Sequence, residues 1–223
     1  MATSKQNTTK TNQLNNLFDQ WENSIQEYKG RFVKDEIIDE ELYDKAKHKI
    51  LFITKEPNNP EQEPGDFRDW WKNELIYTFS YRIAEWSYGL LNDFPQYDEI
   101  WSTKDAGQKA VQSVSLMNIK KSGGKGNSEY NEMMQHLSKN FEFLHQEIDI
   151  INPEIIIIGV TWKELRIALF PDIQWQNSGY GILIGKHKNA KVIDYYHPSS
   201  RNAPPASYSL LQNIIRSSQF KSL

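Results

Sequence analysis

The sequence predicts an α/β fold in three layers, with helices on both faces of a central, mainly parallel sheet of about four strands. Short apolar segments with the composition of buried strands alternate along the chain with segments whose apolar residues recur at helical spacing. The four consecutive isoleucines from Ile155 to Ile158 are typical of a strand buried on both faces of a parallel sheet. No internal repeat and no long linker divide the 223 residues, so we expect one main domain.

The first helical pattern lies near the N-terminus. Residues 1–10 are polar, and we expect a disordered tail there. Apolar residues then recur at helical spacing before a natural stop at Gly30: Leu14, Leu17, Phe18, Trp21, Ile25 and Tyr28. We therefore assign residues 11–48 to a helical extension that packs on a domain formed by residues 49–223.

The first half of this domain is predicted to hold two strands and a long helix. Residues 49–54 have the pattern of a buried strand, and Pro, Asn and Gly dominate the loop that follows. Residues 70–91 are mostly helical in pattern, and residues 111–118 form the second predicted strand. A loop rich in Lys and Gly follows over residues 119–127.

The second half repeats this alternation. Residues 128–150 form a long amphipathic helix in pattern, and residues 154–159 form the third strand. Thr161 can cap the helix that follows this strand. Residues 191–196 form the fourth predicted strand, and residues 207–220 form a closing amphipathic helix. Alternating strands and helices favour a parallel sheet.

Polar residues follow three of the predicted strands. The loops over residues 54–58, 118–121 and 197–202 all leave the carboxyl ends of strands. In open parallel sheets ligands bind at these ends, because neighbouring loops converge there. We therefore expect the three loops to form one site.

Composition excludes several classes of function. A net charge of −3 and a pI near 6.0 argue against a protein that coats nucleic acid nonspecifically, and leave room for a small basic groove at most. Without cysteine there is no disulfide, no thiolate nucleophile and no cysteine-ligated zinc. His136, His145 and His187 lack metal-ligand spacing, so we expect neither a metal nor a cofactor. No apolar run is long enough to span a bilayer, and a cytoplasmic monomer without a membrane partner is expected.

In order and approximate spacing, the three loops resemble the signature segments of the uracil-DNA glycosylase superfamily. In that family a strand precedes a Gly-x-x-Pro-Gly or Gly-Gln-Asp-Pro-Tyr loop, where this chain has Thr54-Lys-Glu-Pro-Asn58. A second family strand ends in an Asn, matched by Asn118, and a third precedes a His-Pro-Ser loop, matched from His197. With Arg201-Asn202 the last loop is most similar to the single-strand-selective monofunctional branch, and the resemblance covers roughly residues 49–215.

The resemblance implies a monofunctional DNA glycosylase, a DNA-repair enzyme that flips uracil or a related damaged base out of DNA and hydrolyses its N-glycosidic bond. A neutral His197 would donate a hydrogen bond to the base and stabilise its developing negative charge. Glu56, at the position of the family's Asp, would orient water and offset positive charge on the sugar. The Asn118 amide would pair with the edge of the base.

Further contacts follow from the same resemblance. Pro57 and Asn58 would line the base pocket, and Phe67 would stack on the base, with Trp70 or Trp71 as alternatives. The expected DNA contacts of the last loop are Ser199, Ser200, Arg201 and Asn202. Lys120 and Lys121 are added as DNA contacts because their loop is rich in Lys and Gly and could bind phosphate. A solvated, mobile loop is the alternative interpretation of the two lysines.

Two other functions remain open. Thr54 and Asn58 replace family residues, and this change, together with the acidic pI, favours a protein that has lost catalysis and binds nucleic acid, a nucleotide or a protein partner. A different hydrolase could also use Glu56 and His197 on another substrate. A shared pocket for His197, Asn118 and Glu56 would favour the glycosylase.

Overall fold

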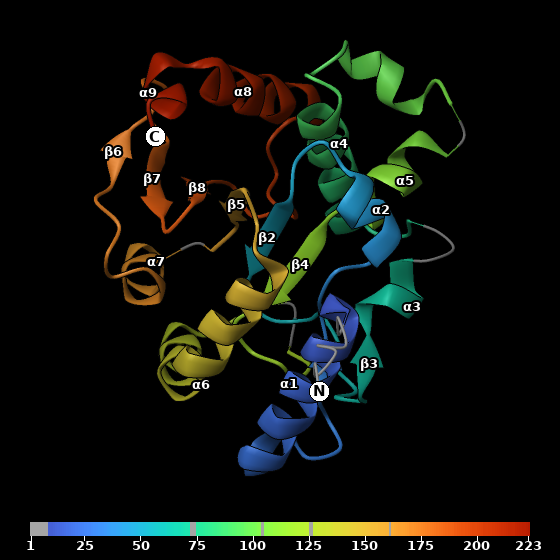
Figure 1. Ribbon diagram of the computed structural model, residues 1–223, viewed down its shortest axis with the longest axis vertical. Helices are drawn as coiled ribbons and strands as arrows, with labels where there is room; N and C mark the ends of the chain where they lie inside the picture. Colours follow the sequence, from blue (N-terminus) through green and yellow to red (C-terminus); the bar gives the residue numbers. More distant parts are fainter. Residues whose placement is uncertain (1–8, 72–74, 104, 125–126, 161) are drawn as a thin grey trace, which may run out of the picture.

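A computed structural model describes residues 9–71, 75–103, 105–124, 127–160 and 162–223. Its central sheet has six strands in the order β4-β2-β5-β8-β7-β6 (Figure 1). The four parallel strands are β2 (Ile50–Thr54), β4 (Ser115–Asn118), β5 (Ile155–Ile158) and β8 (Ala190–Asp194). Two antiparallel strands, β7 (Leu183–His187) and β6 (Gln176–Asn177), extend the sheet beyond β8. The predicted α/β class with a mainly parallel sheet is confirmed, but the sheet is mixed and has six strands.

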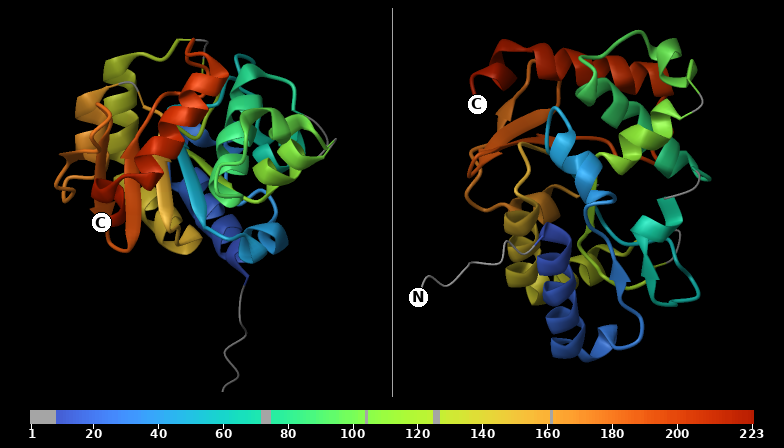
Figure 2. Two further views of the ribbon diagram at one scale, coloured as in Figure 1. Left: turned by 90° about the horizontal axis from the view of Figure 1, so that it is seen from above. Right: turned by 45° about the vertical axis from the view of Figure 1, so that its right-hand side comes forward.

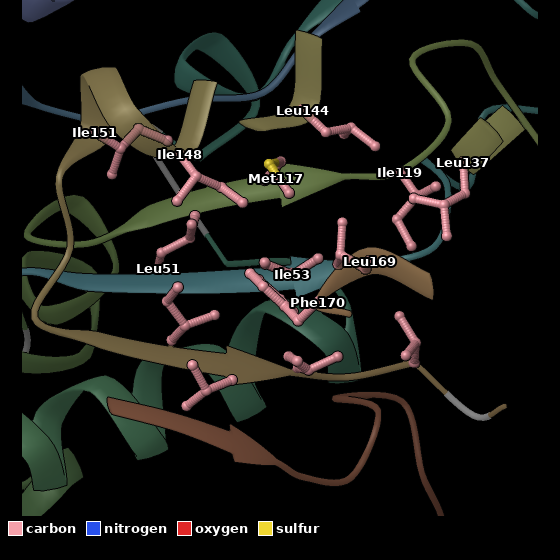
Figure 3. Packing of buried hydrophobic residues seen from close by; sticks show 14 of the residues in the cluster. Leu51, Ile53, Met117, Ile119, Leu137, Leu144, Ile148, Ile151, Leu169 and Phe170 are labelled. Atoms are coloured by element: carbon pink, nitrogen blue, oxygen red, sulfur yellow. The ribbon is translucent and has the colours of Figure 1, made fainter. Parts of the chain in front are cut away.

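Side-chain alternation along the strands divides the core between the two faces of the sheet. Leu51 and Ile53 of β2 belong to one buried cluster, whereas Ile50 and Phe52 belong to the other. Figure 3 shows Leu51 and Ile53 beside Met117 and side chains of the helix above them. All five residues of β2 are buried, which explains why the strand is apolar from Ile50 to Ile53 rather than alternating with polar residues.

Helices cover both faces (Figure 2). The cluster that contains Leu51 includes side chains of α1 (Lys10–Ser24), α6 (Tyr130–Ile151) and α7 (Lys163–Leu169). The other cluster includes side chains of α4 (Thr78–Leu91), α5 (Ala106–Gln112) and α8 (Pro204–Arg216). The remaining elements are short: η1 (Gln26–Tyr28), β1 (Val33–Lys34), α2 (Glu40–Lys45), β3 (Gly65–Asp66), α3 (Phe67–Trp71), η2 (Tyr97–Trp101) and α9 (Ser218–Lys221).

The N-terminal segment is part of this core. Residues 1–8 of the predicted tail lie outside the described residues, and α1 begins at Lys10, where the Thr9 side chain caps it. Trp21 of α1 is fully buried and donates a hydrogen bond from its indole to Asn140 of α6 at 3.1 Å. The segment assigned as an extension therefore packs against a long helix of the domain.

Several predicted boundaries were wrong. The helix expected over residues 70–91 is two helices, α3 and α4, and the closing helix is likewise divided into α8 and α9. The strand expected from residue 111 begins only at Ser115, because α5 continues through Gln112. Strand β7 was missed because Gly185 interrupts its apolar run. A Cβ atom there would lie 2.2 Å from Ile173 Cγ2, so the packing of the sheet favours glycine at this position.

The strand order positions the candidate site. Numbered in chain order, the four parallel strands lie 2-1-3-4, so the chain moves one way along the sheet from β2 to β4 and the opposite way from β4 to β5 and on to β8. In open α/β sheets ligands bind at the carboxyl ends of the two strands beside such a reversal, here β2 and β5. The three polar loops leave β2, β4 and β8 at this same edge.

Candidate active site

The loop that begins at His197 folds over the end of β5. The backbone N–H of Tyr195 donates to Ile158 O at 2.9 Å and continues the pairing of β8 with β5. Beyond it, a Cβ atom at Gly159 would lie 3.1 Å from Pro198 Cδ and 3.4 Å from His197 Cα. Gly159 therefore allows the loop to approach closely, and His197 lies at the carboxyl end of β5, beside the reversal between β2 and β5.

The imidazole of His197 is held as a neutral hydrogen-bond donor. The backbone N–H of Ser199 donates to Nδ1 at 3.1 Å, so in the neutral ring the proton is carried by Nε2. Burial, together with the positive charge of Lys55, lowers the pKa of His197 to about 4. At neutral pH the ring can therefore donate from Nε2 without carrying a net charge.

Lys55 is a site residue to which the sequence assigned no role. It directly follows β2, and its Nζ lies 5.0 Å from the ring centroid of Trp162, which precedes α7. The Trp162 ring in turn contacts Tyr130 edge-on at 5.6 Å between centroids. Burial lowers the pKa of Lys55, although the charge of Glu56 opposes the shift. The feature that could have identified Lys55 is its position at the carboxyl end of β2, beside the reversal in strand order.

The aromatic residue in contact with His197 is Phe79 of α4, not Phe67. The ring centroids of Phe79 and His197 are 5.8 Å apart. Phe79 contacts Trp71, which contacts Phe67, and both of these residues are buried in the hydrophobic cluster. Trp70 contacts Phe67 and is partly exposed. Phe67 is thus connected to His197 through two intervening rings and lies deep in the core.

Asn118 lies at the end of β4, directly opposite Thr54 of β2. The Thr54 hydroxyl donates to Asn118 Oδ1 at 2.6 Å, and the backbone N–H of Asn118 donates to Asp35 Oδ2 at 2.5 Å. Asn118 is 1% exposed, and its Nδ2 is buried without a hydrogen-bond partner. Its side-chain oxygen is therefore engaged and its amide nitrogen is buried, so binding a ligand through this amide requires the surrounding side chains to move.

Beneath Asn118 lies a buried charged cluster of Asp35, Lys121 and Glu147. Lys121 Nζ contacts Asp35 and lies 2.6 Å from Glu147 Oε2, and none of the three side chains has exposed surface. Burial opposes the charged form of Lys121, but the two carboxylates outweigh it and raise the pKa of the ammonium. Burial also raises the pKa of Glu147 well above its usual range. The prediction that Lys121 contacts DNA is wrong, because its charge is enclosed in the core.

Lys120 is also paired. Its Nζ lies 3.0 Å from Glu56 Oε2 and 2.7 Å from Glu132 Oε1, and the Lys120 and Glu56 side chains are almost fully buried. Residues 119–124 are all buried, so this part of the loop is neither solvated nor a surface for phosphate, which corrects both interpretations of Lys120 and Lys121. A Cβ atom at Gly124 would lie 2.0 Å from Glu56 Oε2, so the glycine makes room for the carboxylate.

The other predicted contacts divide between buried and exposed positions. Pro57 is buried, whereas Asn58 is exposed and forms a bridge with Gly124. In the His197 loop Ser200 is half-buried and its neighbours are exposed: Ser199, Arg201 and Asn202. The sequence also missed Arg82 of α4, a buried side chain that donates to Asn202 O at 3.2 Å and to Ser207 Oγ at 2.8 Å. It anchors the end of the loop.

Two surface hollows, of about 370 and 540 Å³, lie away from the candidate site, one beside Asp66 and Arg68 and the other beside Leu137 and Phe141. The described residues contain no cluster of three or more His, Asp or Glu side chains placed to hold a metal ion. Nor does any helix among them have the length and apolar character needed to cross a membrane.

No protein-family model matches the chain, and no curated protein matches it. The chemistry of the site is therefore argued from its own side chains. A neutral imidazole that donates from Nε2, with the Lys55 ammonium nearby, suits a group that gains negative charge. The structure brings His197, Lys55 and Phe79 together. Asn118 and Glu56 lie at the same edge of the sheet, where Asn118 is hydrogen-bonded to Thr54 and Glu56 is paired with Lys120.

Proposed function

We propose that the chain is a monofunctional DNA glycosylase that hydrolyses the N-glycosidic bond of uracil or a related damaged base, on a three-layer fold like that of the uracil-DNA glycosylases. The state of His197 carries the proposal. Its Nδ1 accepts from Ser199, its low pKa keeps the ring neutral, and Nε2–H is left as a donor. An uncharged donor at a parallel-sheet edge suits a departing base that becomes an anion.

In the proposed reaction the bond between C1′ and the base nitrogen breaks, and its electron pair leaves with the base. His197 Nε2–H donates to a base carbonyl oxygen, and the Lys55 ammonium adds positive potential. Water then adds its oxygen to C1′, and the proton that it loses ends on the departed base anion, so the products are the neutral base and an abasic sugar. Glu56 is the candidate that orients this water, with its Oε2 held by Lys120 at 3.0 Å. Phe79 replaces Phe67 as the candidate for stacking on the base, because it contacts His197.

One observation favours the second candidate, a superfamily fold without catalysis that binds nucleic acid, a nucleotide or a protein. Thr54 stands where the resembled family has Gly, and its hydroxyl occupies the Asn118 oxygen that would accept from the base. Reading uracil with both amide atoms requires this bond to open, at a cost of about 1 kcal/mol. A protein that binds a ligand without reading uracil does not need the hydrogen bond between Thr54 and Asn118 to open.

Excision of uracil separates the two. The full-length chain is incubated with single- and double-stranded oligonucleotides that carry one uracil, and alkali then cleaves abasic sites. The glycosylase proposal predicts product with the natural chain and with the control variant His48→Ala, whose histidine is remote in sequence and partly exposed. His197→Ala should lose at least about a hundredfold in rate. No product above the His197→Ala level overturns the proposal, and binding that weakens steeply with salt but yields no product favours the second candidate.

A further inference from the structure

One face of α4 contacts the segment that leads from β8 through the His197 loop into α8. Phe79, Arg82 and Trp86 lie on this face, because they are three and four positions apart in the helix. The Phe79 ring contacts the His197 ring at 5.8 Å between centroids. The Trp86 ring packs edge-on against Tyr195 at 5.0 Å. Helix α4 also packs against α8 (Figure 1), so it borders the loop at more than one point.

The Arg82 side chain joins this face of α4 to the end of the loop. It is only 3% exposed, and both of its terminal nitrogens donate to Asn202 O at 3.2 Å. Nη1 also donates to Ser207 Oγ at 2.8 Å. A buried guanidinium is costly unless its N–H groups have acceptors, so these bonds favour a single position for the end of the loop.

Ser207, near the start of α8, connects the two ends of the loop. Its hydroxyl accepts from Arg82, which also holds Asn202 at the end of the loop. Its backbone carbonyl accepts from the hydroxyl of Tyr195, which lies two residues before His197. The chain before the loop is therefore bound to Ser207 directly, and the chain after it is bound to the same residue through Arg82.

A carboxylate orients Arg82 from its other side. Glu85 Oε2 lies 3.1 Å from Arg82 Nε, and the hydroxyl of Tyr97 in η2 donates to Glu85 Oε1 at 2.5 Å. Burial raises the pKa of Glu85, while the bond from Tyr97 and the charge of Arg82 oppose the shift. A planar guanidinium with Nε on a carboxylate and its terminal nitrogens on the loop has one orientation that satisfies every contact.

The position of the loop determines the environment of the His197 ring. The N–H of Ser200 donates to His197 O at 2.8 Å, and the N–H of Ser199 donates to Nδ1. These two bonds lie within the loop and preserve its shape, whereas Arg82 and Ser207 bind its ends to two helices. Burial and the charge of Lys55, which lower the pKa of His197 to about 4, both depend on where the loop places the ring.

We propose that Arg82 is a positioning residue for His197, acting through its bonds to Asn202 and Ser207 at the two ends of the loop. Arg82 does not touch the base in this account; it keeps the ring partly buried and beside Phe79. The consequence for excision rests on the proposed glycosylase function, whereas the placement of the ring does not. Removing the fork of N–H groups should therefore change the state of His197 as well as the stability of the chain.

The test measures the pKa of His197 by NMR titration of the full-length chain, with the signal assigned by its loss in His197→Gln. Arg82→Lys keeps the charge but not the fork, and should raise this pKa by at least about one unit, towards its ordinary value. Ser207→Ala removes one acceptor of Arg82 and should shift it in the same direction. Tyr208→Phe is the matched control, because it removes a neighbouring buried hydroxyl that donates to Pro95 O at 2.9 Å, and it should leave the pKa unchanged.

An unchanged pKa of His197 in the folded variants overturns the proposal, even where urea denaturation shows lower stability, because a purely structural role does not alter the ring in folded molecules. Ser207→Ala decides the question if circular dichroism shows that Arg82→Lys does not fold. Where the natural chain excises uracil, Arg82→Lys should lower kcat at least about tenfold and change KM less than about threefold. A chain without excision contradicts the proposed function alone, since the titration of His197 requires no activity.

Discussion

Two loops leave the same edge of the sheet and use their polar residues in opposite ways. The loop after β4 carries Lys120 and Lys121, and both ammonium groups are turned inward against carboxylates. The loop after β8 exposes Ser199, Arg201 and Asn202, and holds His197 neutral. The comparison teaches that basic residues in a sequence do not define a basic surface. Acidic partners from distant segments decide which charges reach solvent.

The largest expected effect is the loss of stability when the buried ammonium group in the loop after β4 is removed. Lys121→Met leaves Asp35 and Glu147 buried without a cation, so the free energy of unfolding should fall by about 3–5 kcal/mol. Urea denaturation measures the change, and Lys109→Met, on an exposed lysine, is the control that should stay within about 0.5 kcal/mol. A loss below about 1 kcal/mol for Lys121→Met would show that the ammonium is not enclosed.

The next effect concerns His197 and pH. Its folded pKa of about 4 lies below the ordinary value, so the unfolded chain binds the proton more tightly. The neutral ring therefore costs no stability above pH 6.5, and the free energy of unfolding decreases as the pH falls from 6.5 towards 4. His197→Gln should remove about 1–3 kcal/mol of this acid-dependent loss, as measured by denaturation at pH 7 and pH 4. An unchanged pH dependence would contradict a half-buried ring that stays neutral.

A smaller effect is expected from Thr54→Ala. The variant loses the hydrogen bond to Asn118 Oδ1, so the free energy of unfolding should fall by about 1 kcal/mol. If Thr54 blocks an amide that reads a base, the variant should also bind uracil-containing oligonucleotides more tightly, which a lower KM or Kd would show. Weaker binding with the same loss of stability would mean that the hydroxyl only positions Asn118.

The smallest effect on stability belongs to the exposed loop. Arg201→Ala should leave the free energy of unfolding within about 0.5 kcal/mol, in contrast with Lys121→Met. If the guanidinium contacts a phosphate, the slope of log K against log salt for a single strand should fall by about 0.7. Thermal denaturation and salt titrations of oligonucleotide binding measure the two quantities. An unchanged slope would remove Arg201 from the set of DNA contacts.

The fold was predictable where burial leaves a local pattern. The run from Ile155 to Ile158 and the apolar strand before Thr54 indicated buried parallel strands, and both lie in the middle of the sheet. Strand β7 was hidden because Gly185, required by Ile173, interrupts its pattern. The carboxyl-edge position of the three loops followed from the alternation of strands and helices.

The pairing within the site was not predictable, because it depends on contacts between distant segments. Lys121 and Asp35 are 86 positions apart, and Thr54 and Asn118 are 64 apart. Nothing local to either lysine indicates that acids from another segment enclose it. Phe79 could not be distinguished from its aromatic neighbours, because helical spacing does not show which ring turns toward His197. The tautomer of His197, by contrast, follows from a local turn to Ser199.

The dependence of uracil excision on pH tests the central claim most directly. If neutral His197, with a pKa of about 4, donates from Nε2 to the departing base, the single-turnover rate should be level from about pH 5 to pH 8. The rate should fall as the pH is lowered towards 4, where the ring becomes charged. A rate that falls as the pH rises through 6.5 would mean that the protonated ring is the active form. That result, or the absence of product above the His197→Ala level at every pH, would contradict the account.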